Sequence, residues 1–533
     1  MGENSNKKQD KAKVTEIKTF PVPFPLREKQ ENLTINTKTP SQPIKEKILN
    51  QASKFHSQGN ILEAGKLYQY LINQGFKDYR VFSNYGGILK DLGNLKEAEL
   101  LTQKAIQLNP YFASAHYNLG SILRNLGNLK EAELCMQKAI ELNPDFAEAH
   151  YNLGNILKDL GNLKEAELST RKAIQLNPNI AESHSNLGNI LSDLGRLKEA
   201  ELSTRKAIEL KPNFAKAYYN LGMILTNLGN QHDAELSLRK AINIEPGLTN
   251  AAEELANRLY LDKKYDLAIK YLEKNISNNG QSLYLSCLLC LDREKDFNQK
   301  YEDLSQKKIC NADMSGVIEH ANIIYEQRNK SHFCNEAINY ILLEKIDKEL
   351  FSEKHFNQLI SYIQSDEIKT KPQSLIHKAS QSTGNLFSLD YPFMKALKKA
   401  IEIKIKHYRT KFKDSQQGFI ENWPTEYRLR SWILCMKNGG FIKPHNHRYG
   451  WITGSFYLNV PKTNNNDNAG NISFSYQGPE YPKKGKKFNS TIKKIDTRDI
   501  CMFPSSLFHH TIPFQGNEER ICLVFDLVKK TQN

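Results

Sequence analysis

The feature that most constrains the fold is a repeat with a period of 34 residues. Three kinds of residue return in phase: glycine at Gly86, Gly120, Gly154, Gly188 and Gly222, alanine at Ala98, Ala132, Ala166, Ala200 and Ala234 and again at Ala105, Ala139, Ala173, Ala207 and Ala241, and proline at Pro110, Pro144, Pro178, Pro212 and Pro246. Small residues let two helices approach closely, and a proline ends the second helix. A Gly-Asn pair such as Gly161-Asn162 suits the turn between them. The period therefore predicts stacked pairs of antiparallel helices.

This pattern resembles the tetratricopeptide repeat. Weaker copies continue it, because Ala64 is in phase upstream and Ala256 and Ala268 are in phase downstream. We expect an all-α superhelix of seven repeats over residues 43–280, followed by a helical capping region over 281–344 that protects the last apolar face. Residues 1–42 are polar, lysine-rich and interrupted by prolines, so they predict a flexible leader.

The composition fits a multidomain cytoplasmic protein. A chain of 533 residues exceeds one core, and no apolar run is long enough to cross a membrane. Eight irregularly spaced cysteines predict reduced thiols, and Cys287 and Cys290 lie in an apolar run that favours core thiols over a zinc site. The net charge of +15 is spread along the chain and paired with acids, which does not favour a nucleic-acid partner.

One polar column of the repeat points to a polypeptide partner. It consists of Asn84, Asn118, Asn152, Asn186 and Asn220. The column falls on the first helix of each unit, the helix that lines the concave face, and it resembles the asparagine ladder of O-linked N-acetylglucosamine transferase. A side-chain amide offers a donor and an acceptor to any peptide unit. The other interpretation is a column retained by recent duplication, since the copies are nearly identical.

Beyond about residue 345 the pattern changes from helical stretches, such as the one beginning at Pro392, to short alternating runs. These runs are YRLRSWILCM, GSFYLNV, NISFSY, DICMF and RICLVFDLV. Separated by Gly, Asn and Pro clusters, they predict antiparallel strands of a sandwich or barrel.

The residues that carry chemistry gather in the last hundred. His445 and His447 are two apart, so on a strand both imidazoles face one side. His509 follows about sixty residues later, and Arg520 comes 11 residues after it. A close ligand pair, a distal histidine and an arginine are the order expected of facial-triad oxygenases, whose metal keeps open positions. An arginine fork suits the distant carboxylate of 2-oxoglutarate.

This region resembles the family of 2-oxoglutarate and Fe(II) oxygenases that often follows tetratricopeptide repeats, whose pattern runs HxH, SGxYYL, FPSxLxH and RISxxFN. The likeness covers roughly residues 345 to 530, with Gln381 to Phe387 and Ser431-Trp432 also similar, and we expect the domain to span residues 345–533. It implies an α+β domain with a double-stranded β-helix (jelly-roll) core. It also implies Fe(II) held by His445, His447 and His509, and 2-oxoglutarate held by Arg520 with help from Tyr457. The implied activity is a dioxygenase that hydroxylates a polypeptide presented by the repeat groove.

Two departures and one ambiguity leave alternatives open. The usual facial triad has a carboxylate two residues after the first histidine, but His447 holds that place, so the third ligand is either this histidine or a carboxylate from elsewhere, such as Asp467 or Asp499. His509 and His510 are adjacent, and His509 is in phase with FPSxLxH. Cys522 stands where the family often has serine.

A competing interpretation is a non-catalytic scaffold, in which the repeats bind peptide and the jelly roll is inactive. A scaffold does not need His445, His509 and Arg520 to converge, and this distinguishes the two. A sugar transferase with similar repeats is not favoured, because nothing after residue 345 resembles a Gly-rich nucleotide-binding turn.

Overall fold

The computed structural model describes residues 42–273, 276–365, 368, 370, 371, 375–461, 468–479 and 481–530. By its contacts the chain divides into two compact units, residues 1–76 and 77–533. The predicted leader lies outside the described residues except for residue 42. A search of the described helices found none with the length and apolar character needed to cross a membrane.

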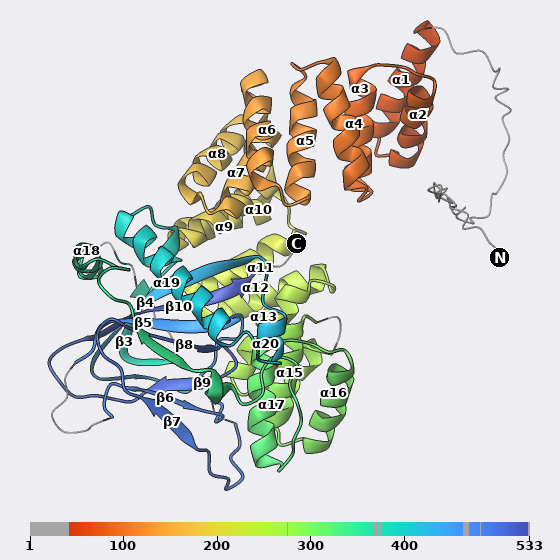
Figure 1. Ribbon diagram of the computed structural model, residues 1–533. Helices are drawn as coiled ribbons and strands as arrows, with labels where there is room; N and C mark the ends of the chain where they lie inside the picture. The colour runs from red at the N-terminus through yellow and green to blue at the C-terminus, as the bar shows by residue number, and fades with distance from the viewer. Residues whose placement is uncertain are drawn as a thin grey trace, which may run out of the picture. The chain divides into compact units, whose positions relative to one another are not determined.

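The helices of the repeats confirm the predicted superhelix of antiparallel pairs (Figure 1). The first unit contains α1 (Gln42–Ser57) and α2 (Ile61–Asn73). In the second unit the pairs are α3 (Tyr79–Asp91) and α4 (Leu95–Leu108), α5 (Ala113–Asn125) and α6 (Leu129–Leu142), α7 (Ala147–Leu160) and α8 (Leu163–Leu176), α9 (Ala181–Asp193) and α10 (Leu197–Leu210), α11 (Ala215–Asn227) and α12 (Gln231–Ile244), and α13 (Thr249–Leu261) and α14 (Tyr265–Tyr271).

The periodic small residues explain how closely the helices of a pair pack. Ala166 and Ala173 of α8 are fully buried. A Cβ on Gly154 of α7 would lie only 2.3 Å from the Thr170 hydroxyl oxygen. Gly161 ends α7 with a φ of 87°, in the left-handed region that glycine adopts without strain.

Three helices and a short turn follow the repeats. They are α15 (Asn278–Cys290), α16 (Glu294–Gln306), α17 (Ala312–Ile324) and the 3-10 turn η1 (Ala337–Tyr340). Cys287 is buried and all eight cysteines are free thiols. Strand β1 (Leu342–Lys345) begins three residues before the predicted boundary at residue 345. The domain limits therefore stay predictions, while the order of helical array and strand-rich region is confirmed.

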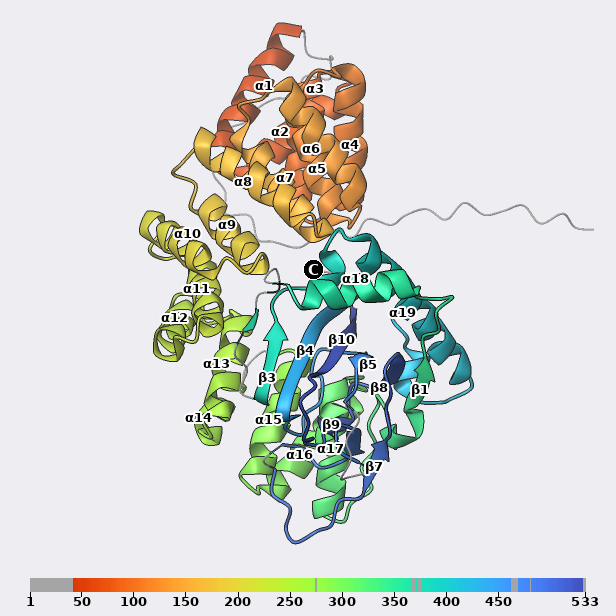
Figure 2. The ribbon, with the colours of Figure 1, turned by 90° about the vertical axis from the view of Figure 1, so that its left-hand side faces the viewer.

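The last part of the chain forms two antiparallel sheets, which confirms the predicted fold class. The large sheet has the order β1-β8-β5-β10-β4-β3-β2 and the small sheet β7-β6-β9 (Figure 2). The strands after β1 are β2 (Thr370–Lys371), β3 (Ile376–Ser382), β4 (Tyr427–Ile442), β5 (Ile452–Asn459), β6 (Ile472–Ser475), β7 (Ser490–Lys493), β8 (Asp499–Pro504), β9 (Phe508–Thr511) and β10 (Arg520–Lys529).

Helices α18 (Glu353–Ile363), α19 (Pro392–Lys411) and α20 (Gly418–Glu421) and the turn η2 (Leu386–Ser388) complete the domain. Leu397 and Ile401 of α19 share one core with Leu429 and Ile433 of β4. The turn after β3 is tied to β4 through Asn385, whose Oδ1 accepts from the Ser431 backbone N–H at 2.9 Å. The stretch from Gln381 to Phe387 thus supports the large sheet, and its first residue, Gln381, also lines a cavity of the domain.

We expect the substitution Gly154→Ala to lower the free energy of unfolding by about 1 kcal/mol. The added methyl group would displace Thr170 from its hydrogen bond to the Ala166 carbonyl. Overpacking of this kind costs about 1 to 3 kcal/mol of stability, which exceeds the roughly 1 kcal/mol that alanine gains over glycine in helix propensity. Urea unfolding measures the change. The control is Gly247→Ala, where a Cβ meets no atom within 4 Å and stability should hold; equal effects would contradict the packing argument.

Candidate metal centre

A cavity of about 450 Å³ opens over the inner faces of β4, β5 and β10 and the segment that follows β4. Its lining includes His445, His447, His509, Tyr457 and Arg520. These five residues are the ones that sequence reasoning assigned to the metal and to 2-oxoglutarate. The structure brings all of them to one cavity.

The three histidines converge on a single point. Their possible ligand atoms all lie within 4.8 Å of one another. The ring centroid of His445 lies 4.4 Å from that of His509 and 5.2 Å from that of His447. Two backbone hydrogen bonds join His445 and His509, with N···O distances of 3.1 and 2.9 Å. Metal bonds to histidine are near 2 Å, so this spacing suits one bound ion.

Hydrogen bonds orient each ring and leave its Nε2 as the ligand atom. The Nδ1 of His445 donates to the Lys443 carbonyl at 2.9 Å, and that of His509 donates to the Leu507 carbonyl at 3.2 Å. The Nδ1 of His447 faces Oδ1 of Asp526 at 2.7 Å. Partners of this kind fix the tautomer and raise ligand basicity in metal sites.

The rings of His445 and His509 are held in the neutral form, which is the form that can bind metal. Burial, together with the neighbouring His447, lowers the pKa of His445 to about 3. Burial lowers the pKa of His509 well below its usual range, with His445 adding to the effect. Neutral imidazole is the ligating form, so no proton has to leave before an ion binds at neutral pH.

The surroundings of His447 favour this histidine, rather than Asp467 or Asp499, as the third residue that could bind the metal. Trp432 stacks against its ring at a centroid distance of 5.7 Å. Asp499 lies at the start of β8 and accepts from the Asp496 backbone N–H, outside the histidine cluster. Asp467 lies outside the described residues. His510 is not part of the cluster, and its Nδ1 is buried without a hydrogen-bond partner among the described residues.

Sequence reasoning missed Asp526. Its Oδ1 contacts His447 and also accepts from the Thr453 hydroxyl at 2.8 Å. One signal could have found it, because side chains two apart on a strand share a face. Asp526 lies six residues after Arg520 on β10, so both had to face the same cavity.

Arg520 is buried in the same cavity without a carboxylate partner. It is 2% exposed, and its Nε donates to the Gly470 carbonyl at 2.8 Å. Among the described residues no carboxylate lies within ion-pair distance of its guanidinium, which lies 5.0 Å from the Tyr457 ring centroid. The Tyr457 hydroxyl is also buried with no hydrogen-bond partner in the described chain. The Sγ of Cys522 lies 3.7 Å from Arg520 Nη1, so a sulfur stands where the family often has a hydroxyl.

The asparagine column is partly committed to contacts within the protein. Asn118 donates to Ser83, Asn152 to Ser121 and Asn220 to Ser185, at 3.0 to 3.3 Å. Asn186 donates to Thr170 at 3.3 Å. Asn186 and Asn220 are each only 6% exposed, whereas Asn84, Asn118 and Asn152 are half-buried.

Comparison with protein families matches both parts of the chain. Residues 430–526 match the family described as "Putative 2OG-Fe(II) oxygenase". Models described as tetratricopeptide or TPR repeats match residues 79–112, 101–133, 120–161, 147–180, 181–214 and 204–235. The chain therefore carries tetratricopeptide repeats over 79–235 and, over 430–526, a domain of the oxygenase family's pattern.

Comparison with individual proteins adds little to these matches. A search of the curated proteins found no match. Among solved structures, the chain is similar to YrrB, a TPR protein with an unusual peptide-binding site, at 28% identity over 34% of this chain and 95% of that one, with a TM-score of 0.29. A tetratricopeptide repeat protein from Parabacteroides merdae is 17% identical over 46% and 98%, with a TM-score of 0.39.

We expect Tyr457→Phe to leave the stability of the protein unchanged or to raise it by up to about 1 kcal/mol, because the lost hydroxyl is buried without a partner. The matched control is Tyr408→Phe. The Tyr408 hydroxyl donates to the Tyr340 carbonyl at 2.7 Å, so its loss should cost about 1 to 3 kcal/mol. Urea unfolding of both variants measures the difference. A similar loss in both would mean that Tyr457 has a partner of its own.

Proposed function

We propose that the protein is an Fe(II)- and 2-oxoglutarate-dependent dioxygenase that hydroxylates a polypeptide. The observation that carries this proposal is the combination found in one cavity: three converging, oriented histidines and a buried arginine with no carboxylate partner among the described residues. A scaffold has no need of a buried cation that is left unpaired, because burying a charge alone is costly.

In this proposal His445, His447 and His509 hold Fe(II) through their Nε2 atoms. Three protein ligands leave positions open for the keto acid and for dioxygen. When bound, iron and 2-oxoglutarate supply the oxidising chemistry, in which dioxygen gives one oxygen atom to a substrate C–H bond and one to 2-oxoglutarate, which leaves as succinate and carbon dioxide. Asp526 holds His447 in the ligating tautomer, and Trp432 packs against its ring.

Arg520 and Tyr457 bind the distant carboxylate of 2-oxoglutarate. No acidic side chain of the described residues pairs with the guanidinium of Arg520. The distant carboxylate of 2-oxoglutarate would therefore be its ion-pair partner. The orphaned Tyr457 hydroxyl can donate to the same carboxylate. Both groups are buried, which strengthens charge-assisted hydrogen bonds relative to water.

The substrate is a polypeptide that the concave face of the repeats delivers. Support comes from the contact between the cavity wall and the repeats, where Arg448 Nη1 donates to Asn257 of α13 at 2.8 Å. On the asparagine column, Asn84, Asn118 and Asn152 remain accessible enough to contact a peptide, while Asn186 and Asn220 act mainly within the protein. The free thiols are consistent with the cytoplasmic location that we propose.

Anaerobic titration of the protein with Fe(II) and 2-oxoglutarate tests the proposal. We expect the weak visible charge-transfer band of the metal chelate to appear in the wild type and to be lost in His509→Ala. His510→Ala is the matched control, because the neighbouring histidine lies outside the cluster and should keep the band. Absence of both band and metal binding in the wild type would favour the scaffold interpretation instead.

We expect Arg520→Lys to weaken 2-oxoglutarate binding about 10- to 100-fold, because a compact ammonium cannot form the two-pronged contact of a guanidinium. Metal binding should persist, since Arg520 is not in the histidine cluster. Calorimetric titration of the metal-loaded protein gives the dissociation constant. Arg498→Lys serves as control, as Arg498 pairs with Glu353 at 2.6 Å and does not line the cavity. Unchanged affinity in Arg520→Lys would remove Arg520 from the site.

A further inference from the structure

Helix α17, which follows the repeats in the chain, lies against both segments that carry the histidines. A Cβ on its Gly316 would come within 2.6 Å of the Ser506 carbonyl oxygen and 3.1 Å of the Asn446 amide nitrogen. Ser506 lies just before His509, and Asn446 lies between His445 and His447. Only a glycine allows so close an approach at this point of the helix. A helix of the region predicted as a cap of the repeats therefore packs directly against the segments that carry the histidines.

Further along α17, His320 holds another part of the oxygenase domain. Its Nδ1 accepts from the Gly478 backbone N–H at 3.1 Å, and its Nε2 donates to the Pro482 carbonyl at 3.0 Å. The ring also stacks on Phe488 at a centroid distance of 4.6 Å. These contacts fix the position of α17 relative to the sheets without using the histidine cluster.

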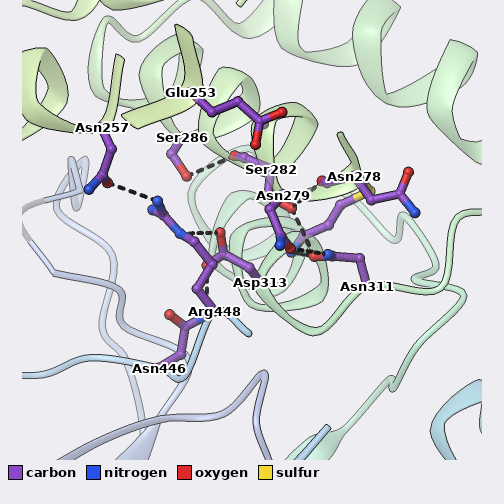
Figure 3. A network of polar contacts seen from close by, with 12 residues as sticks. Glu253, Asn257, Asn278, Asn279, Ser282, Ser286, Asn311, Asp313, Asn446 and Arg448 are labelled. Carbon is purple, nitrogen blue, oxygen red and sulfur yellow. Dashed lines mark hydrogen bonds and ion pairs between the residues drawn. The ribbon is translucent and has the colours of Figure 1, made fainter. Parts of the chain in front are cut away.

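A carboxylate of α17 reaches the segment between the first two histidines (Figure 3). Asp313 is 3% exposed. Its Oδ1 accepts from the Asn446 amide at 3.1 Å, and its Oδ2 accepts from Arg448 Nε at 3.0 Å. Arg448 extends to Asn257 of α13, so the contacts continue into the repeats. One carboxylate thus holds two side chains that flank His447.

We propose that Asp313 is a positioning residue for the metal, which sets the place of His445 and His447 by holding the side chains between and after them. The proposal rests on the proposed metal role of these histidines. His445, Asn446, His447 and Arg448 are consecutive, and all four line the cavity. Asn446 and Arg448 are each bound to Asp313 of α17. Holding these two side chains therefore restrains the backbone that carries both histidines.

Charge explains why a carboxylate is needed at this place. Asp313 forms an ion pair with Arg448, whose side chain is 23% exposed. Burial by itself lowers the pKa of Arg448, but the charge of Asp313 raises it above its usual range. Removing the carboxylate leaves a largely buried cation unmatched, so the segment would have to move to expose it. Movement there displaces the two histidines, because they belong to the same short segment.

Cobalt(II) binding to the full chain tests the proposal, because absorption of bound cobalt reports both affinity and coordination geometry. We expect Asp313→Asn and Asn446→Ala to weaken Co(II) binding about 10- to 100-fold, the usual cost of losing a partner that orients ligands. Asn446→Ala leaves the Asp313–Arg448 ion pair in place, so it decides the question if Asp313→Asn does not fold. The visible spectrum of bound cobalt should change in intensity in both variants.

The matched control is Glu344→Gln, which removes an ion pair with Lys404 at 3.0 Å inside the same domain but away from the cavity. This variant should lose stability and keep the wild-type cobalt affinity and spectrum. If the folded variants of Asp313 or Asn446 bind cobalt as the wild type does, the positioning role is overturned. If the wild type itself binds no cobalt, the proposed function fails, which is a different result.

Discussion

Two backbone hydrogen bonds between His445 and His509 are the contact on which the rest of the site depends. His445 follows a strand of the large sheet, and His509 lies on a strand of the small sheet. The bonds bring residues about sixty positions apart to adjacent places with their rings 4.4 Å apart. His447 follows two residues after His445, and its ring lines the same cavity. The register of the pairing between His445 and His509 therefore determines whether the three imidazole rings converge.

The sequence was sufficient to predict the repeats, the main strands and five of the residues that line the cavity, namely His445, His447, Tyr457, His509 and Arg520. The 34-residue period indicates paired helices directly. The spacing of His445, His447, His509 and Arg520 resembles the order of metal-binding and cosubstrate-binding residues in facial-triad oxygenases. Partners such as Asp313 and Asp526 could not be found in this way. Each is a common acidic residue whose role depends on a contact across 79 or more positions, and such contacts leave no local pattern. The same holds for the asparagines that bond within the array.

In the proposed complex, the charges around the cavity would compensate for a ligand set of three histidines in place of the usual set with one carboxylate. Fe(II) would bring two positive charges and Arg520 one. The two carboxylates of 2-oxoglutarate and the carboxylate of Asp526 would balance them. The acid that the usual facial triad has at the place of His447 lies one hydrogen bond further away here, behind the His447 ring. The ligands would differ from the usual set, while the sum of charge at the site would not.

The contact of α17 with the histidine segments also limits how a gene of this kind can be rearranged. A crossover between residues 324 and 342 would separate Asp313 from Asn446 and Arg448 and leave a largely buried cation without its acid. A gene fragment that encodes the strand-rich region without α17 would therefore lack a partner of the histidine segment.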